Sequence, residues 1–331
     1  MRQINRKLRS AIVGVVAFTA FAGFSVNVSS LEVDPKLEAY KNVSGISGKV
    51  KSIGSDTLNN LMTLWSEGFR SIYPGVKVEI EGKGSSTAPP ALIEGTAQFG
   101  PMSRKMKPKE VDAFEKKFGY KPLKVRVAVD ALAIFIHKDN PVKSLTMQQL
   151  DAIFSKNRKG GYAHDIKTWG DLGLGGEWAN KPISLYGRNS ASGTYGYFKK
   201  VVLSKGDYKD SVNEQPGSSA VVQGVAKDKY GMGYSGVGYK TADVNTVPLA
   251  VEQGEDAYEA NAANAYSGDY PLARFLYVYI NKNPIKELDP LRREFLKYVF
   301  SSGGQKIVIK DGYYPVSKAI AAEDLNSLGV Y

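Results

Sequence analysis

Strand-like and helix-like segments alternate along this chain, with short turns between them. Residues 76–80 and 125–129 alternate apolar and polar side chains with a period of two, and the second of these runs into the more continuously apolar residues 131–136. Residues 183–186 and 275–280 are further strand candidates. Apolar side chains recur with the helical period in residues 58–72 and again in the segment that begins at Thr146. Such alternation is typical of α/β proteins, so we expect sheets flanked by helices.

The first thirty residues differ from the rest of the chain. Four cations, Arg2, Arg6, Lys7 and Arg9, precede the apolar stretch 11–24, and small residues follow it. At about 14 residues this stretch is shorter than the roughly 20 that a membrane anchor needs. We therefore interpret residues 1–30 as a signal peptide rather than an anchor, with cleavage between Ala22 and Ser30, and we expect a soluble protein outside the cytoplasm.

Composition excludes several kinds of chemistry. The chain has 331 residues, which suggests two domains, and a net charge of +11. Four of those positive charges lie in the leader, so the remainder carries +7, scattered among acids in a way that does not favour nucleic acid as a partner. With no Cys and only two His, we expect no disulfide, no thiol nucleophile, no metal site and no catalytic triad.

Three polar turns carry the chemistry, and each follows a strand candidate and precedes a helix candidate. They are residues 54–57, residues 82–90 and residues 187–194. Helix starts present free backbone N–H groups and favour an anion, and Arg188 adds a planar fork of donors to the third turn. Each turn alone is explained well enough by helix capping. Three together favour a site for an oxyanion.

Other motifs are misleading. Residues 231–236 match G-x-G-x-x-G, but no helical pattern follows, so we expect a turn and a strand rather than a dinucleotide site. Residues 82–86 lack the spacing of a phosphate-binding P-loop. Neither Ser190 nor Ser192 has the flanking glycines of a nucleophile elbow, which disfavours a serine enzyme.

The chain resembles the phosphate-binding components of bacterial phosphate ABC transporters, the PstS family, among the type II periplasmic binding proteins. The resemblance spans nearly all of the chain after the leader, and its matching segments are residues 54–57 with Trp65, 84–86, 94–100, 140–154, Trp169, 188–194, 231–234, 270–274, 304–305 and 312–313. It implies a two-lobed α/β fold of the Venus-flytrap type, each lobe a mixed sheet flanked by helices, joined by crossing hinge strands. We expect lobe I in residues 31–128 plus 245–331 and lobe II in residues 129–244.

The resemblance also implies the phosphate ligands. In lobe II they are Arg188, Ser192, Gly193 and Thr194. In lobe I they come from three segments, namely Ser55, Asp56 and Thr57, then Ser85 and Ser86, then Ser103 and Arg104.

Two positions depart from the family pattern. Many members have an Asp where this chain has Ser103, to accept the proton of hydrogen phosphate, and many have an acid where this chain has Ser190. Our hypothesis is that Asp56 replaces the missing acceptor; the alternative is that it caps the helix that follows. Arg104 would either bind phosphate directly or pair with Asp56.

The function implied is high-affinity binding of inorganic phosphate in the periplasm by a monomer that needs no cofactor, and delivery to the permease and ATPase of an importer. The alternatives are a secreted phosphatase and a phosphate-binding matrix or adhesion protein on the same fold.

Overall fold

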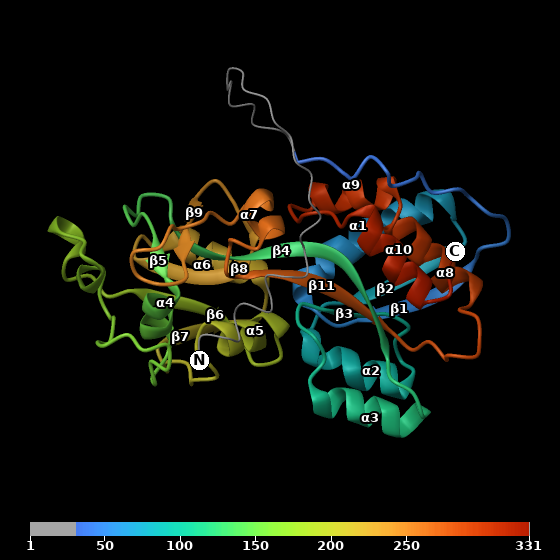
Figure 1. Ribbon diagram of the computed structural model, residues 1–331, viewed down its shortest axis with the longest axis horizontal. Helices are drawn as coiled ribbons and strands as arrows, with labels where there is room; N and C mark the ends of the chain where they lie inside the picture. Colours follow the sequence, from blue (N-terminus) through green and yellow to red (C-terminus); the bar gives the residue numbers. More distant parts are fainter. Residues whose placement is uncertain (1–30, 331) are drawn as a thin grey trace, which may run out of the picture.

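The computed structural model describes residues 31–330, so the expected signal peptide lies outside the described residues. Two long antiparallel strands, β4 and β11, run side by side through the middle of the molecule, and further elements gather around each of their ends (Figure 1). The molecule is therefore elongated, with two halves that share these strands.

The strands form one large mixed sheet and two small ones. The strands of the seven-stranded sheet are, in spatial order, β3 (Gly100–Met102), β11 (Ala273–Ile280), β4 (Leu123–His137), β8 (Gly231–Gly236), β6 (Ser184–Arg188) and β7 (Val212–Gln215), with β9 (Val244–Thr246) also paired to β4. The small sheets are both parallel and pair β1 (Gly48–Ile53) with β2 (Val76–Glu81) and β5 (Leu145–Thr146) with β10 (Leu249–Ala250).

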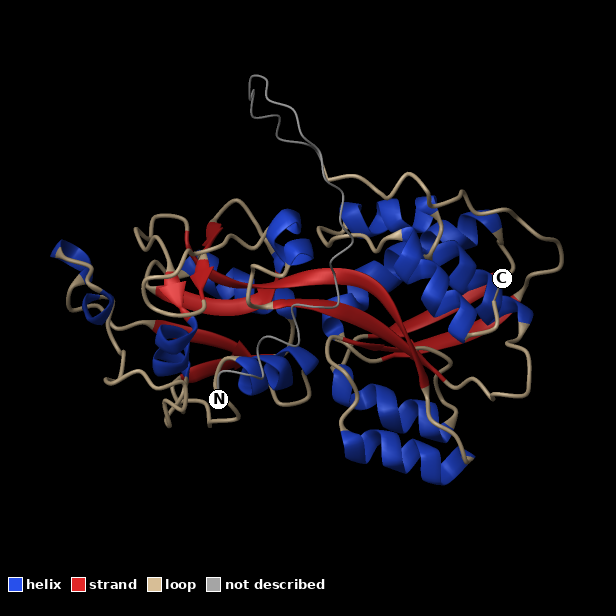
Figure 2. Cartoon of the chain, viewed as in Figure 1, coloured by secondary structure: helices blue, strands red, loops and turns tan. Residues whose placement is uncertain are grey.

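Helices flank the sheets in both halves (Figure 2). Around one half lie α1 (Asn59–Ile72), α2 (Ala88–Glu94), α3 (Pro108–Phe118), α8 (Pro290–Val299), α9 (Ser302–Lys310) and α10 (Lys318–Ser327). Around the other lie α4 (Met147–Phe154), α5 (Gly193–Val201), α6 (Ser218–Lys227) and α7 (Ala262–Ser267). None of the helices described is long and apolar enough to cross a membrane.

Local sequence explains the best defined elements. In α1 the apolar residues Leu61, Met62, Trp65 and Phe69 share one buried face, as the helical period predicts. Thr146 begins α4 with a capping box, in which its hydroxyl accepts from Gln149 N–H and the Gln149 side chain returns to the Thr146 N–H. The G-x-G-x-x-G string forms β8, a wholly buried strand, as expected.

The hydrophobic residues form two main cores that meet along β4 and β11. One core takes its buried side chains from residues 37–128 and from residues 276–330 apart from Tyr314, and the other from residues 129–272 with Tyr314. A third, smaller cluster packs α2 and α3 against β3 and β11.

The point at which the chain passes from lobe II back to lobe I differs from the one expected from the sequence. Residue 245 was the expected boundary, yet Val247, Leu249, Tyr270 and Leu272 pack in the core of residues 129–272. The reason is that β9 and β10 add to the strands of that half, pairing with β4 and β5. We therefore propose that lobe II comprises residues 129–272 and lobe I the rest of the described chain, with one boundary inside β4 and the other at the start of β11.

Candidate functional site

The three polar turns meet where the two lobes touch. Each follows a strand and opens a helix: β1 leads into α1, β2 into α2 and β6 into α5. The first two turns are joined by a hydrogen bond from Gly84 N–H to Gly54 O (2.7 Å), and the second reaches lobe II through Ser86 N–H to Ala191 O (3.1 Å). The fold thus brings together segments that lie more than a hundred residues apart.

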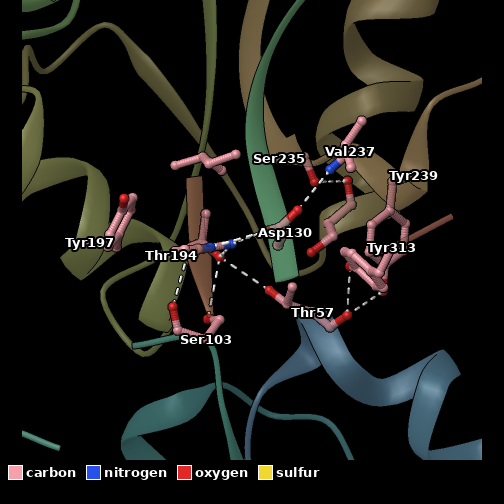
Figure 3. Close-up of polar contacts among 12 residues, drawn as sticks. Thr57, Ser103, Asp130, Thr194, Tyr197, Ser235, Val237, Tyr239 and Tyr313 are labelled. Carbon is pink, nitrogen blue, oxygen red and sulfur yellow. Dashed lines mark hydrogen bonds and ion pairs between the residues drawn. The ribbon is translucent and has the colours of Figure 1, made fainter. Parts of the chain in front are cut away.

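Four hydroxyls from these segments form a buried cluster, shown in part in Figure 3. Thr57 Oγ1 lies 3.1 Å from Thr194 Oγ1, and Ser103 Oγ lies 3.4 Å from the same atom. Ser85 Oγ is 3.3 Å from Ser103 Oγ and accepts the Ser103 N–H at 3.0 Å. None of the four residues is more than 1% exposed. Hydroxyls of both lobes therefore interact directly away from water.

Arg188 brings a positive charge to the same region. It is 1% exposed, and its terminal nitrogens donate to Ser218 Oγ (2.7 Å) and Pro216 O (3.2 Å). Burial lowers the pKa of Arg188, and the carboxylate of Asp56, 3.2 Å away in lobe I, opposes that shift. Within residues 31–330, its buried Nε–H has no hydrogen-bond partner. A buried donor without a partner is costly, and this one would be satisfied by an anion.

Asp56 connects the lobes. Its Oδ2 accepts the backbone N–H of Ser218 at 2.7 Å, at the first residue of α6. No side-chain cap is present at the start of α1. Asp56 therefore caps a helix of lobe II, and the alternative that it caps the helix following it is wrong.

Arg104 pairs with Glu110 and not with Asp56. Its guanidinium makes two hydrogen bonds of 2.7 Å to the carboxylate of Glu110, in the first turn of α3, and one of 3.3 Å to Ser86 Oγ. The expected pair of Arg104 with Asp56 is therefore wrong. Both terminal nitrogens of Arg104 already donate to the carboxylate of Glu110, which is only six residues away in the sequence. Direct binding of phosphate by Arg104 stays a prediction.

Ser192 and Gly193 start α5. The Ser192 hydroxyl accepts the N–H groups of Thr194 (3.1 Å) and Tyr195 (3.3 Å), so this side chain is the helix cap. A Cβ on Gly193 would lie 2.2 Å from Ser85 Oγ and 2.6 Å from Ser103 Oγ. Only glycine lets the α5 start approach lobe I this closely. Ser55 is also buried here, and its N–H donates to Pro101 O at 2.8 Å.

Sequence reasoning missed several residues of the site. Ser218 holds both Arg188 and Asp56, and Tyr239 and Tyr313 donate their hydroxyls to the carbonyls of Asp56 (3.0 Å) and Thr57 (2.9 Å). Asp130 and Arg274 form an ion pair beside Thr194. The last two had a signal, since each is a lone charge in an apolar strand segment.

Two surface hollows lie elsewhere. Their volumes are about 370 and 390 Å³, and they are lined by residues around Arg70 and around Lys209. No group of three or more His, Cys, Asp or Glu side chains that could hold a metal ion is found within residues 31–330. Apart from the carboxylates of Asp56 and Asp130, the site residues carry donor groups suited to an oxyanion.

Comparison with known proteins defines the class. A family model, the PBP superfamily domain, matches residues 41–302. A relative from Pseudomonas aeruginosa named Phosphate-binding protein PstS is 57% identical over 319 residues, covering 96% of this chain and 98% of that protein. The chain therefore belongs to the PBP superfamily and, within it, to the PstS family, which confirms the resemblance inferred from the sequence.

Solved structures agree with the fold. A candidate phosphate ABC transporter substrate-binding protein from Clostridium perfringens, crystallised with bound phosphate, has a TM-score of 0.69 and 26% identity, over 82% of this chain and 100% of that one. An ABC-type phosphate transport receptor from Vibrio cholerae has a TM-score of 0.62 at 20% identity, over 81% of this chain and 100% of that one. The two-lobed α/β architecture expected from the sequence is confirmed. The relatives cited carry the names of binding and transport proteins rather than enzymes.

Proposed function

We propose that this chain binds inorganic phosphate between its lobes and delivers it to an ABC-type importer. The observation that carries the proposal is the buried Nε–H of Arg188, which has no partner in the described part of the chain and lies in the region where hydroxyls from both lobes meet. The names of the relatives in Pseudomonas aeruginosa and Clostridium perfringens support phosphate as the anion.

Donors from both lobes would surround the anion. The Arg188 guanidinium supplies charge-assisted hydrogen bonds, and the Thr57, Ser85, Ser103 and Thr194 hydroxyls supply neutral ones. Ser192 and Gly193 place the start of α5 here, where the helix dipole favours negative charge. Ser55, Ser86 and Arg104 complete the proposed set, and Arg104 donates to Ser86 Oγ at 3.3 Å.

Binding requires the lobes to move. The hydroxyls of Thr57 and Thr194 contact each other directly, so an anion can enter between them only when the lobes separate. The two cores meet along β4 and β11, so these strands would bend. Phosphate would then favour the closed form because it contacts both lobes there, and the closed form would dock on the importer.

Discrimination against sulfate would depend on Asp56. Hydrogen phosphate has a proton to donate and sulfate has none, so a carboxylate accepts a hydrogen bond from phosphate but repels sulfate. The Oδ2 of Asp56 is used by Ser218 and Arg188, which leaves Oδ1 for this role.

Calorimetric titration of the purified, phosphate-stripped chain with phosphate and with sulfate tests both points. We expect one phosphate bound per chain and sulfate bound at least tenfold more weakly, with that preference reduced about tenfold in Asp56→Asn, roughly the value of one charged hydrogen bond. Absence of phosphate binding would refute the function. An unchanged preference in Asp56→Asn would refute the acceptor role alone.

The cellular setting follows from the same proposal. Residues 1–30 would direct export and be removed, which places the protein in the periplasm as a freely diffusing monomer. Its macromolecular partners would be the permease and ATPase subunits of a phosphate importer.

A further inference from the structure

A buried ion pair joins the two long strands at the level of the hydroxyl cluster. Asp130 on β4 and Arg274 on β11 are direct partners in the antiparallel register. Asp130 is 0% and Arg274 7% exposed, and the Arg274 Nε and Nη2 donate to Asp130 Oδ2 at 2.9 and 2.8 Å. Burying two charges is expensive even when they are paired, so stability alone is a weak reason to have the pair here.

The pair is tied to both lobes. Arg274 Nη1 donates to Ser103 O (3.1 Å) in lobe I, and Nη2 donates to Thr194 Oγ1 (3.0 Å) in lobe II. Asp130 Oδ1 accepts the Val237 N–H at 3.1 Å, and the Arg274 guanidinium lies 5.1 Å from the centre of the Tyr197 ring. Figure 3 shows Asp130 on its strand beside Thr194 and Ser103. The orientation of the guanidinium is therefore fixed on several sides.

This contact decides the direction of the Thr194 hydroxyl. Because Thr194 Oγ1 accepts an N–H from Arg274, its own proton must point to another acceptor. The nearby oxygens are those of Thr57 and Ser103, at the place where the anion is proposed to bind. A phosphate oxygen is a good acceptor, so Thr194 would meet it as a donor already oriented.

We propose that Arg274, held by Asp130, is a positioning residue that fixes the Thr194 hydroxyl as a donor to phosphate. This proposal rests on the proposed function and adds a residue to it. Asp130 balances the charge of Arg274, and the guanidinium already has protein partners for Nε, Nη1 and Nη2. Arg274 therefore acts through Thr194. Arg274 lies on β11, a strand shared by both lobes, so its hydrogen bond to Thr194 would also connect the bending strands with the bound phosphate.

A double-mutant cycle tests this route. Asp130→Asn with Arg274→Gln removes both charges together, which avoids leaving one buried charge unpaired. This neutral pair is made in the natural chain and in Thr194→Val, which keeps the shape of threonine without the hydroxyl. We expect the neutral pair to weaken phosphate binding about tenfold in the natural chain and less than about twofold in Thr194→Val.

The control is another Arg–Asp ion pair, whose arginine lies on β4. Arg126 on β4 pairs with Asp324 on α10 at 2.7 Å, away from the hydroxyl cluster, so Arg126→Gln with Asp324→Asn should leave phosphate affinity unchanged. If the neutral pair at Asp130 and Arg274 does not fold, Arg274→Lys keeps the charge but loses the fork, and it should show the same dependence on Thr194.

Equal weakening in both backgrounds would overturn the proposal, because Arg274 would then act independently of Thr194. The proposal would also be overturned if the neutral pair, made in the natural chain, left the affinity for phosphate unchanged. A natural chain that binds no phosphate would refute the proposed function and this inference with it. Binding by the natural chain with equal weakening in both backgrounds would refute the inference alone.

Discussion

At the scale of single residues, Arg188 shows what the site requires. Arg188 is charged although it is only 1% exposed. Ser218 and Pro216 orient its terminal nitrogens, and Asp56 of the other lobe balances its charge. Such a residue is expensive to bury and has a donor left over. A bound anion would offset the free energy of burying this charge and this donor, which would explain why Arg188 is here.

Arg188→Ala should therefore weaken phosphate binding by tenfold or more, as expected for charge-assisted hydrogen bonds in a site that excludes water. Calorimetry or equilibrium dialysis measures the loss. Arg70→Ala is the matched control, because Arg70 is exposed on α1, and it should bind phosphate like the natural chain. Equal affinity in the two variants would rule out Arg188 as a ligand.

Asp311 gives a prediction about pH. Burial raises its pKa from 3.8 to about 6, and a hydrogen bond from Asn60 partly opposes this. The folded state therefore binds the proton more tightly, so the stability that this group contributes is present below pH 3.8 and is lost as pH rises through about 6.

Asp311→Asn keeps an acceptor for Asn60 but does not titrate. It should be more stable than the natural chain above pH 6 by roughly 1 kcal/mol, allowing for solvent at this half-buried position, and should lose that advantage near pH 4. Urea unfolding at pH 4 and pH 7.5 measures both. An advantage of the same size at both pH values would contradict the assigned cause.

At the scale of elements, the starts of α1, α2 and α5 make the site. Their strand and helix patterns are local, so the sequence predicted α1, α4, β2 and the course of β4 and β11 closely. The capping turns were recognisable for the same reason. The partners of those turns were not, since Ser218 meets Asp56 from 162 residues away and Arg274 meets Asp130 from 144 residues away. Tertiary packing alone brings them together.

The turn of α5 makes an element-scale prediction. A Cβ on Gly193 would lie 2.2 Å from Ser85 Oγ, so Gly193→Ala should prevent close approach of the lobes and weaken phosphate binding at least tenfold. Gly196→Ala is the control in the same helix. A Cβ on Gly196 would lie 3.6 Å from Arg104 Cδ, which is an ordinary van der Waals contact. Gly196→Ala should bind phosphate normally and be slightly more stable. Equal affinity in both variants would show that the approach of this turn to lobe I is not needed.

At the scale of the whole molecule, two cores share a pair of strands. The first crossing lies in β4 between Ala128 and Val129, where buried side chains pass from one core to the other. The return lies at the start of β11, between Leu272 and Leu276, because residues 245–272 add strands to lobe II. Sequence patterning placed the crossing strands but not the return, since an apolar residue such as Leu249 suits either core equally well.

In the function proposed, both lobes bind one phosphate through Arg188 and the hydroxyl cluster. A crystal structure of the chain with phosphate would show whether they do. We predict a single anion between the lobes, within hydrogen-bond distance of the Arg188 guanidinium, of Thr194 from lobe II and of at least one of Thr57, Ser85 and Ser103 from lobe I. Phosphate bound to one lobe only, or at a place without Arg188, would show that the two lobes do not bind it in the way proposed.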